Sequence, residues 1–199
     1  MYTPKRLFNS TLLLLVLSIT LQYCSQPVAE TPPAAPINEN FEITTMEYAN
    51  MAEQALARLI NLDIEGWSEM LADDAEYYFP DGDAGTRTKL TGKTEVVAWW
   101  KKWRETSGIE KMTIKNGVHI PIVAKKTLKY TGLTGEIVLS YFSNEMTYDG
   151  VVVRVRMHFA AHFNKAKKID RYYTYYDRTP IINAVKYNIL DPETVTVDP

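Results

Sequence analysis

The chain is poor in the residues that form disulfides, metal centres and nucleophilic sites. Among its 199 residues there is one cysteine, Cys24, and there are three histidines. One cysteine cannot form a disulfide within the chain, so the fold has to rest on its apolar core. The sequence has no G-x-S-x-G motif and no second thiol, so it does not indicate a nucleophilic triad.

The three histidines do not have the spacing of a metal site. His158 and His162 are four residues apart in a predicted strand, which separates them by about 13 Å at ~3.3 Å per residue. No third ligand lies near them in the sequence, and His119 belongs to a different predicted strand. We therefore expect neither a metal site nor a cofactor.

The chain also lacks an apolar run long enough to span a membrane. Leu12–Leu21 supplies about ten mostly apolar residues, whereas a span needs roughly 20. Lys5 and Arg6 precede this run and Cys24 follows it, which resembles a bacterial export signal ending at a lipid-modified cysteine. Tyr23 departs from the small residue that normally precedes such a cysteine. An ordinary signal peptide with a chance cysteine is the alternative.

Composition divides the rest of the chain into a tether, one domain and a tail. After the signal (1–24), residues 25–40 contain four prolines and almost no large apolar side chain, which is typical of an extended tether. Residues 41–185 have the length of one domain, and 186–199 form a C-terminal tail. Ser25 follows the cysteine, where aspartate is absent, and this favours an outer-membrane lipoprotein facing the periplasm.

The net charge gives no support to two classes of partner. Once Lys5 and Arg6 are removed with the signal, 20 basic residues remain against 24 acidic ones, a net charge of −4. Such a balance gives no reason to expect nucleic acid or an anionic membrane surface as a partner. We expect contact with the membrane through the lipid anchor only.

Helical signals come first along the domain. Thr44–Glu47 has the pattern of a capping box that opens a helix. Asp63 is placed to cap a second, short helix, and Asp73–Asp74 is expected to end it. Glu76–Phe79 predicts a short aromatic strand. Gly92 precedes a third helix, whose apolar positions follow a helical spacing. These positions are Val96, Trp99, Trp100 and Trp103.

Four strands are predicted after the helices, because the apolar period changes to two. They are 112–124, 135–148, 151–163 and 168–177. Asp149 and Gly150 form a two-residue hairpin turn, which fixes the register of the second and third strands. In that register Glu145 faces Arg154, a favourable cross-strand ion pair.

The two sides of this sheet are expected to differ. If Phe163 pairs with Lys168, then Asp170 joins the apolar side, as the only carboxylate there. Burial would then raise its pKa and suit it to general-base work. The alternative is that Asp170 is solvated or paired at the rim. Three helices followed by a curved antiparallel sheet with one apolar face predict an α+β domain.

Three segments carry a family resemblance. DIEGWSEMLADDAEYYFPDG, LTGKTEVVAWWKKW and KIDRYYTYYD, taken in order, resemble the nuclear transport factor 2-like superfamily, and the SnoaL-like group within it is nearest. The resemblance covers about residues 46–183. It implies a cone-shaped curved sheet covered by about three N-terminal helices. It leaves the function open, because this fold carries isomerases, cyclases, dehydratases, binding modules and transport factors.

The resemblance also bears on catalysis. The ketosteroid isomerases of this superfamily need a carboxylate base and an oxyanion hole made of a tyrosine and a protonated acid. The positions of this chain that match them hold Ala55, Phe79 and Phe159. None of these side chains transfers a proton or donates a hydrogen bond, so the resemblance implies a cone without the isomerase chemistry.

The same resemblance implies a cavity inside the cone. An apolar cavity with a few hydrogen-bonding groups suits a small hydrophobic or aromatic ligand. The residues expected to line it are Tyr77, Phe79, Trp99, Ser140, Asn144, Met157, Phe159, Tyr172 and Tyr176.

Three functions follow as hypotheses. The first is a lipid-anchored domain that binds a small apolar molecule without transforming it. The second is a SnoaL-like isomerase, cyclase or dehydratase that works through Asp170. The third is an interaction module whose polar sheet face, with Arg154, Arg156 and His158, meets a partner protein or a second copy of the chain.

Overall fold

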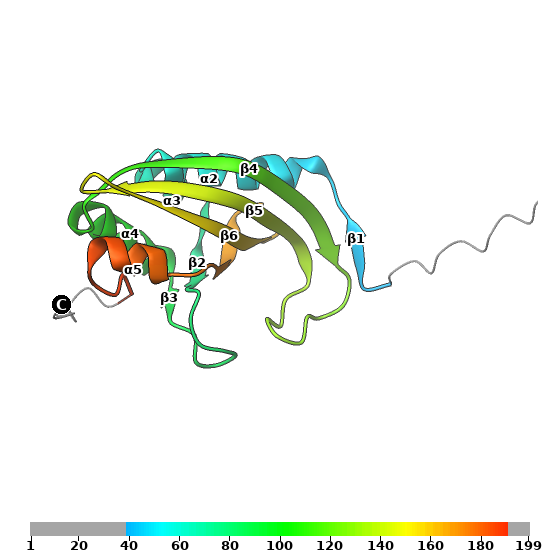
Figure 1. Ribbon diagram of the computed structural model, residues 1–199. Helices are drawn as coiled ribbons and strands as arrows, with labels where there is room; N and C mark the ends of the chain where they lie inside the picture. Colours follow the sequence, from blue (N-terminus) through cyan, green and yellow to red (C-terminus); the bar gives the residue numbers. More distant parts are fainter. Residues whose placement is uncertain (1–38, 191–199) are drawn as a thin grey trace, which may run out of the picture. The chain divides into compact units, whose positions relative to one another are not determined.

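A curved sheet of seven strands organises residues 39–190, the part of the chain that the computed structural model describes (Figure 1). The strand order is β1-β4-β5-β6-β7-β2-β3. Cys24, the predicted export signal and the predicted tether up to residue 38 lie outside the described residues. No helix within 39–190 is long and apolar enough to cross a membrane.

Helices and short strands come first along the chain, and the long strands follow. In chain order they are β1 (Phe41–Ile43), α2 (Met46–Ile60), α3 (Ile64–Ser68), β2 (Leu71–Tyr78), β3 (Lys89–Thr91), α4 (Lys93–Thr106), β4 (Ile109–Ala124), β5 (Gly135–Tyr148), β6 (Val151–Phe163), β7 (Ile169–Tyr175) and α5 (Thr179–Val185). The chain therefore has the α+β architecture expected from the sequence. Two short strands, β1 and β3, and helix α5 were not predicted.

The predicted hairpin is confirmed residue by residue. Tyr148 pairs with Val151 across the turn, and Glu145 pairs with Arg154. The Nε of Arg154 lies 2.7 Å from Oε2 of Glu145. The turn works because Asp149 and Gly150 both have positive φ, 45° and 78°, as this type of two-residue turn requires.

The second strand was predicted too short. Asp73 and Asp74, expected to end a helix, lie in the middle of β2. Both are exposed where the pairing with β7 is irregular between Leu71 and Glu76, so these two polar residues interrupt the apolar pattern without ending the strand. β2 runs parallel to β7. The sheet is therefore mixed: this one pair is parallel, and the other strand pairs are antiparallel as expected.

The helices begin as the sequence indicates, with one difference in detail. The side chain of Asp63 accepts a hydrogen bond from the Gly66 amide, 2.9 Å away, and caps α3. Thr45 stands at the N-cap of α2, but its side chain makes no capping bond. The predicted capping box is therefore not formed, and α2 is held by the burial of its apolar face against β4 and β5.

The last strand corrects the placement of Asp170. Phe163 pairs with Ile169 instead of Lys168, and the ladder is irregular between His162 and Phe163. This irregularity turns Asp170 away from the helix-covered side, and its Oδ1 lies 2.5 Å from Nδ1 of His162. Asp170 is therefore not a carboxylate of the apolar side, as the sequence had indicated.

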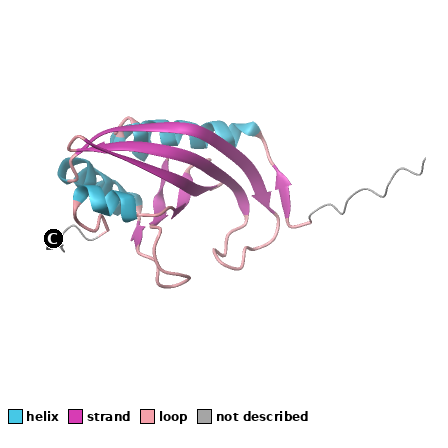
Figure 2. Ribbon diagram, in the orientation of Figure 1, coloured by secondary structure: helices cyan, strands magenta, loops and turns pink. Residues whose placement is uncertain are grey.

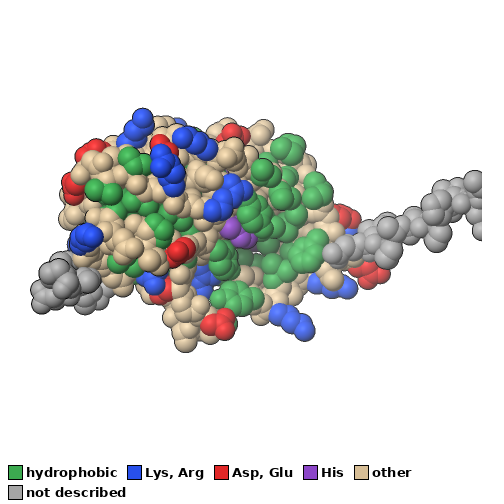
Figure 3. Space-filling model, viewed as in Figure 1, with side chains coloured by type: hydrophobic (Ala, Val, Ile, Leu, Met, Phe, Trp, Pro, Cys, Tyr) green, Lys and Arg blue, Asp and Glu red, His purple; other side chains and the backbone are tan. Residues whose placement is uncertain are grey.

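One side of the sheet is covered by helices and the other is not. In the view of Figures 1 and 2, α2 runs behind β4 and β5, so the uncovered side faces the viewer. We call this uncovered side the outer face. It was expected to be polar, but hydrophobic side chains gather over a large part of it (Figure 3). The polar pair of Arg154 and Glu145 occupies the end near the β5–β6 hairpin.

Candidate functional site

The helix-covered side of the sheet encloses a small cavity of about 50 Å³. We call it the interior cavity. Strands β4, β5 and β6 form its floor, and helices α2, α4 and α5 surround it. It is lined by Leu56, Leu59, Ile60, Trp99, Trp100, Trp103, Met112, Ile114, Phe142, Asn144, Met146, Tyr148, Met157, Phe159, Tyr176, Ile181 and Ile189.

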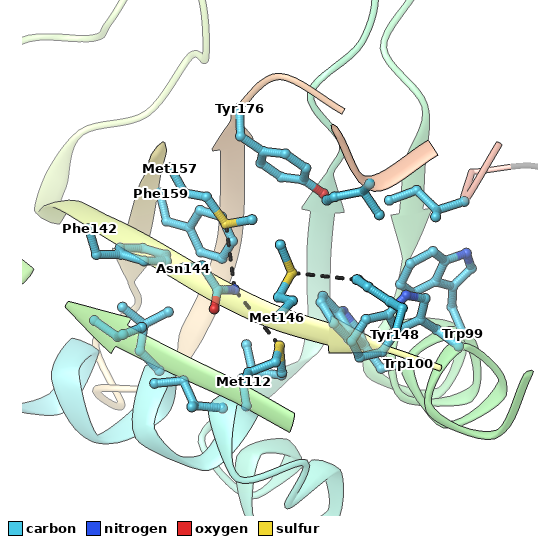
Figure 4. Close-up of a pocket in the computed structure, with 17 residues that line it drawn as sticks. Trp99, Trp100, Met112, Phe142, Asn144, Met146, Tyr148, Met157, Phe159 and Tyr176 are labelled. Atoms are coloured by element: carbon cyan, nitrogen blue, oxygen red, sulfur yellow. Dashed lines mark hydrogen bonds between the residues drawn. The ribbon is translucent and has the colours of Figure 1, made fainter. Parts of the chain in front are cut away.

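Asn144 is the polar centre of this cavity (Figure 4). It lies on β5 and is 7% exposed. Its Nδ2 donates weak hydrogen bonds to the Sδ atoms of Met112 and Met157, at 3.8 and 3.9 Å. The Tyr148 hydroxyl donates in the same way to Met146, at 3.5 Å. The cavity thus pairs its donors with thioethers, which are weak acceptors.

Two buried polar atoms of the lining have no protein partner among the described residues. They are Oδ1 of Asn144, an acceptor, and Nε1 of Trp100, a donor. A buried group left without a partner costs about 1–3 kcal/mol. One acceptor and one donor in the wall of the same cavity therefore have no partner among residues 39–190, and each calls for a partner from outside the protein.

The volume limits what the cavity holds in this conformation. At about 50 Å³ it exceeds the roughly 10–15 Å³ needed for one water, but it is far smaller than the roughly 300–1,000 Å³ of pockets for drug-sized ligands. Three methionines line it, and this unbranched side chain changes shape more easily than other apolar residues. A larger ligand would therefore enter by rearranging Met112, Met146 and Met157.

The structure places eight of the nine expected cavity residues in two groups. Five of them line the interior cavity: Trp99, Asn144, Met157, Phe159 and Tyr176. Tyr77, Phe79 and Tyr172 are buried in an adjoining aromatic cluster that also contains Trp67 and Trp100.

Ser140 is the ninth expected residue and has a different role. It is 2% exposed, and its Oγ lies 2.9 Å from Nδ1 of His119 on the neighbouring strand. Ser140 is not among the residues that line the interior cavity. Burial lowers the pKa of His119. This serine–histidine pair was not foreseen, because the two residues are adjacent only through the β4–β5 pairing.

Several lining residues were missed by sequence reasoning. Met146 and Tyr148 share the face of β5 that also carries Asn144, so the hairpin register already contained this information. Met112 lies opposite Met146 on β4. Ile189 was assigned to the C-terminal tail, yet it is 4% exposed and lines the cavity. No local pattern connects Ile189 to the sheet.

The cavity lining contains no carboxylate, histidine or lysine. Its titratable groups are two tyrosines, and burial raises the pKa of both Tyr148 and Tyr176. Both hydroxyls therefore stay neutral near pH 7. The positions matched to the isomerase residues, Ala55, Phe79 and Phe159, are all buried and carry no group that exchanges a proton.

Metal ligands do not converge in the described part of the chain. No group of three or more His, Cys, Asp or Glu side chains in residues 39–190 is arranged to hold a metal ion. His158 is on the outer face, where its ring stacks on Tyr141 and on Tyr175, with centroids 4.3 and 5.4 Å apart.

Comparison with solved structures places the chain within a known fold. A candidate isomerase from Bacillus subtilis shares 16% identity over 73% of this chain and 97% of its own, with a TM-score of 0.55. A candidate polyketide cyclase from Xanthomonas campestris pv. campestris shares 12% identity over 71% and 99%, with a TM-score of 0.54. A nuclear transport factor 2-like protein from Burkholderia xenovorans LB400 shares 18% identity over 72% and 99%, with a TM-score of 0.51.

Comparisons at the level of sequence do not identify a family. No protein-family model matches the chain, and no curated protein matches it. At such low identities the structural likeness establishes the shared fold alone.

Proposed function

We propose that this protein, whose folded part has the nuclear transport factor 2-like fold, binds a small apolar molecule in the interior cavity without transforming it. The observation that carries the proposal is the pair of unsatisfied polar atoms in the cavity wall, Oδ1 of Asn144 and Nε1 of Trp100. A ligand with one donor and one acceptor on an apolar frame would satisfy both.

The lining argues against chemistry at this site. Structural relatives include proteins described as an isomerase and a polyketide cyclase, and general acid–base catalysis would be the corresponding activity. Such catalysis needs a titratable group poised near the working pH. The lining offers only Tyr148 and Tyr176, whose pKa values are raised by burial. Asp170 faces away from the cavity and contacts His162.

Phenol and toluene form a matched pair of probes for this proposal. The two molecules are similar in size, but only phenol carries a hydrogen-bond donor and acceptor. We expect phenol to raise the unfolding temperature of the full chain, with a shift that grows with the logarithm of its concentration once the site is mostly filled, as a ligand of the native state does. Toluene should raise it less. Equal shifts with the two probes would contradict the role of the unsatisfied atoms.

Two substitutions locate the site. Asn144→Leu should remove the advantage of phenol over toluene, because the acceptor is lost. Tyr176→Ala should weaken the binding of both probes, because this ring closes one side of the cavity. His158→Ala is the control, since His158 lies on the outer face. An equal loss in the control would rule out the interior cavity as the site.

The attachment to the membrane is a separate proposal. Lys5, Arg6, the apolar run and Cys24 support export followed by lipid modification of Cys24, and Ser25 supports an outer-membrane location facing the periplasm. Mass spectrometry of the mature chain tests this directly. A chain that begins at Cys24 and carries acyl chains supports the proposal, and a chain cut elsewhere contradicts it.

A further inference from the structure

A second and larger hollow lies on the outer face, on the opposite side of the sheet from the interior cavity. Its volume is about 420 Å³, and we call it the outer groove. Figure 3 shows this face, with hydrophobic side chains around a hollow beside two loops. The groove is lined by Phe41, Ile122, Leu128, Thr131, Leu133, Ile137, Leu139, Ala160, His162, Tyr173 and Tyr175.

The groove exists because of one small residue and one loop. Ala160 pairs with Leu139 on one side and with Tyr173 on the other, so a methyl group stands between two large side chains. The β4–β5 loop then forms a wall. Hydrogen bonds between Leu128 and Leu133 (2.9 Å) and between Gly132 and Leu128 (2.8 Å) fold this loop back on itself. Leu128 and Leu133 line the groove as a result.

His162 lines the groove, and both of its ring nitrogens already have partners in the protein. Nδ1 of His162 lies 2.5 Å from Oδ1 of Asp170, and Nε2 lies 2.9 Å from the carbonyl oxygen of Thr134. Both partners are acceptors, so both ring nitrogens donate. Thr131 Oγ1 also accepts a bond, from the amide of Leu133. A ligand in the groove therefore meets mostly carbon, which favours a hydrocarbon chain.

The guanidinium of Arg87 lies beside two tyrosine rings of the groove wall, and no carboxylate of residues 39–190 is at ion-pair distance from it. The guanidinium carbon of Arg87 lies 5.6 Å from the ring centroid of Tyr173 and 4.6 Å from that of Tyr175. Both rings also line the groove. The bonds that Arg87 makes go to main-chain carbonyls, among them those of Phe79 (2.6 Å) and Thr174 (2.7 Å).

The Arg87 guanidinium has hydrogen-bond donors that its protein contacts do not use. Within residues 39–190 no carboxylate lies at ion-pair distance from Arg87, and its buried Nη1 has no acceptor. Arg87 borders two clefts of about 210 and 320 Å³. Tyr130, which is 47% exposed on the β4–β5 loop, lines both clefts. Tyr130 and Arg87 are therefore neighbours in the walls of both clefts.

We propose that the outer groove binds a free fatty acid, with its hydrocarbon chain over Ala160 and its carboxylate at Arg87. Tyr173 joins the groove to one cleft beside Arg87, and Tyr175 joins it to the other. The apolar groove and the cationic clefts therefore adjoin at these two rings, and their order matches an amphipathic anion. This site lies on the other face of the sheet and does not depend on a ligand in the interior cavity.

Calorimetric titration of the full chain with decanoate and with decanol tests the proposal. The two probes share the ten-carbon chain, and only decanoate is charged. We expect one decanoate per chain and binding at least about tenfold weaker for decanol, since a charge-assisted hydrogen bond is lost. Equal affinities would show that Arg87 does not recognise the head group and would overturn the proposal.

Variants identify the two parts of the site. Ala160→Phe fills the groove and should reduce decanoate binding at least tenfold. Val152→Phe is its matched control, because Val152 is exposed on the same face at the far end of β6; it should bind decanoate as the parent does. Arg87→Gln should lower decanoate binding to the level of decanol. Unchanged decanoate binding by Ala160→Phe would exclude the groove.

Analytical sedimentation tests the alternative that a second copy of the chain occupies the outer face. We expect a monomer with or without decanoate. A stable dimer that Ala160→Phe dissociates would overturn the fatty-acid proposal and would assign the outer face to self-association. Retention of the decanoate site in Asn144→Leu is also expected, and its loss there would place decanoate in the interior cavity instead.

Discussion

The side-chain nitrogen of Asn144 lies 3.9 Å from the sulfur of Met157, and the oxygen of the same amide has no donor among residues 39–190. An apolar residue of similar size would remove that buried acceptor and its cost of about 1–3 kcal/mol. We therefore expect Asn144→Leu to raise the free energy of unfolding of the ligand-free protein by about 1 kcal/mol. Urea denaturation at constant slope measures the change.

The matched control for this substitution is Ser140→Ala. Ser140 is also buried, but its hydroxyl is bonded to His119, so its removal should destabilise the protein. If both variants lose stability, Asn144 is a satisfied core residue and the binding role proposed for it is wrong.

Gly108 is expected to tolerate no side chain. Its φ is +71°, and a Cβ there would lie 2.3 Å from an Oδ atom of Asp149. Gly132 has the same φ, with no atom near its would-be Cβ. Gly132→Ala should cost roughly 1 kcal/mol for the backbone alone, and Gly108→Ala should cost more. Thermal unfolding of both variants gives the difference, and equal losses would show that Asp149 simply moves aside.

The ion pair of His162 predicts a pH dependence. Burial opposes its charge, but the bonds to Asp170 and Thr134 outweigh that effect and raise the pKa of His162 above its ordinary 6.5, although Arg171 nearby lowers it. A raised pKa means that the stabilisation is complete below pH 6.5 and is lost as pH rises through the folded-state pKa.

His162→Gln isolates this contribution. The pKa values of His119 and His158 are lowered by burial, so these two groups add a slope of opposite sign in both proteins. The difference in unfolding free energy between parent and variant should be largest in mild acid and should decrease above pH 6.5. A difference that is constant with pH would mean that His162 is uncharged in the folded protein.

The C-terminal segment after α5 is expected to contribute to the core. Ile189 is 4% exposed and lines the interior cavity, so Ile189→Ala should cost about 2 kcal/mol or more. Ile43, which is 73% exposed, is the control; its replacement by alanine should stay within about 0.5 kcal/mol. Equal effects of the two substitutions would mean that residues 186–190 do not contribute to the core and belong to the tail predicted from the sequence.

The sequence predicted those parts of the fold whose determinants are local. Asp149 and Gly150 set the β5–β6 register by their own backbone preferences, and every pair counted from that turn is found in the structure. Asp63 likewise caps α3 within three residues.

Errors arose where distant segments decide the structure. β2 is held by a parallel partner about a hundred residues away, and its two exposed aspartates look like a helix end when that partner is ignored. Asp170 changes side because of a ladder irregularity that has no signature in the sequence. Within the cavity, Met157 and Phe159 followed from alternation along β6. Ile189 lies after the last strand and after α5, and no local sequence pattern predicts that it reaches the cavity.

The parallel pair of β2 and β7 has a consequence for the order of folding. The hairpins β4–β5 and β5–β6 close through short connections, so they require little loss of chain entropy. β2 precedes them in the chain, but its main partner is the final strand, and only the three residues of β3 pair with it on the other edge. The chain must therefore be complete through Tyr175 before β2 can pair with β7. We therefore expect β2 to join the sheet last, although it precedes β4, β5 and β6 in the chain.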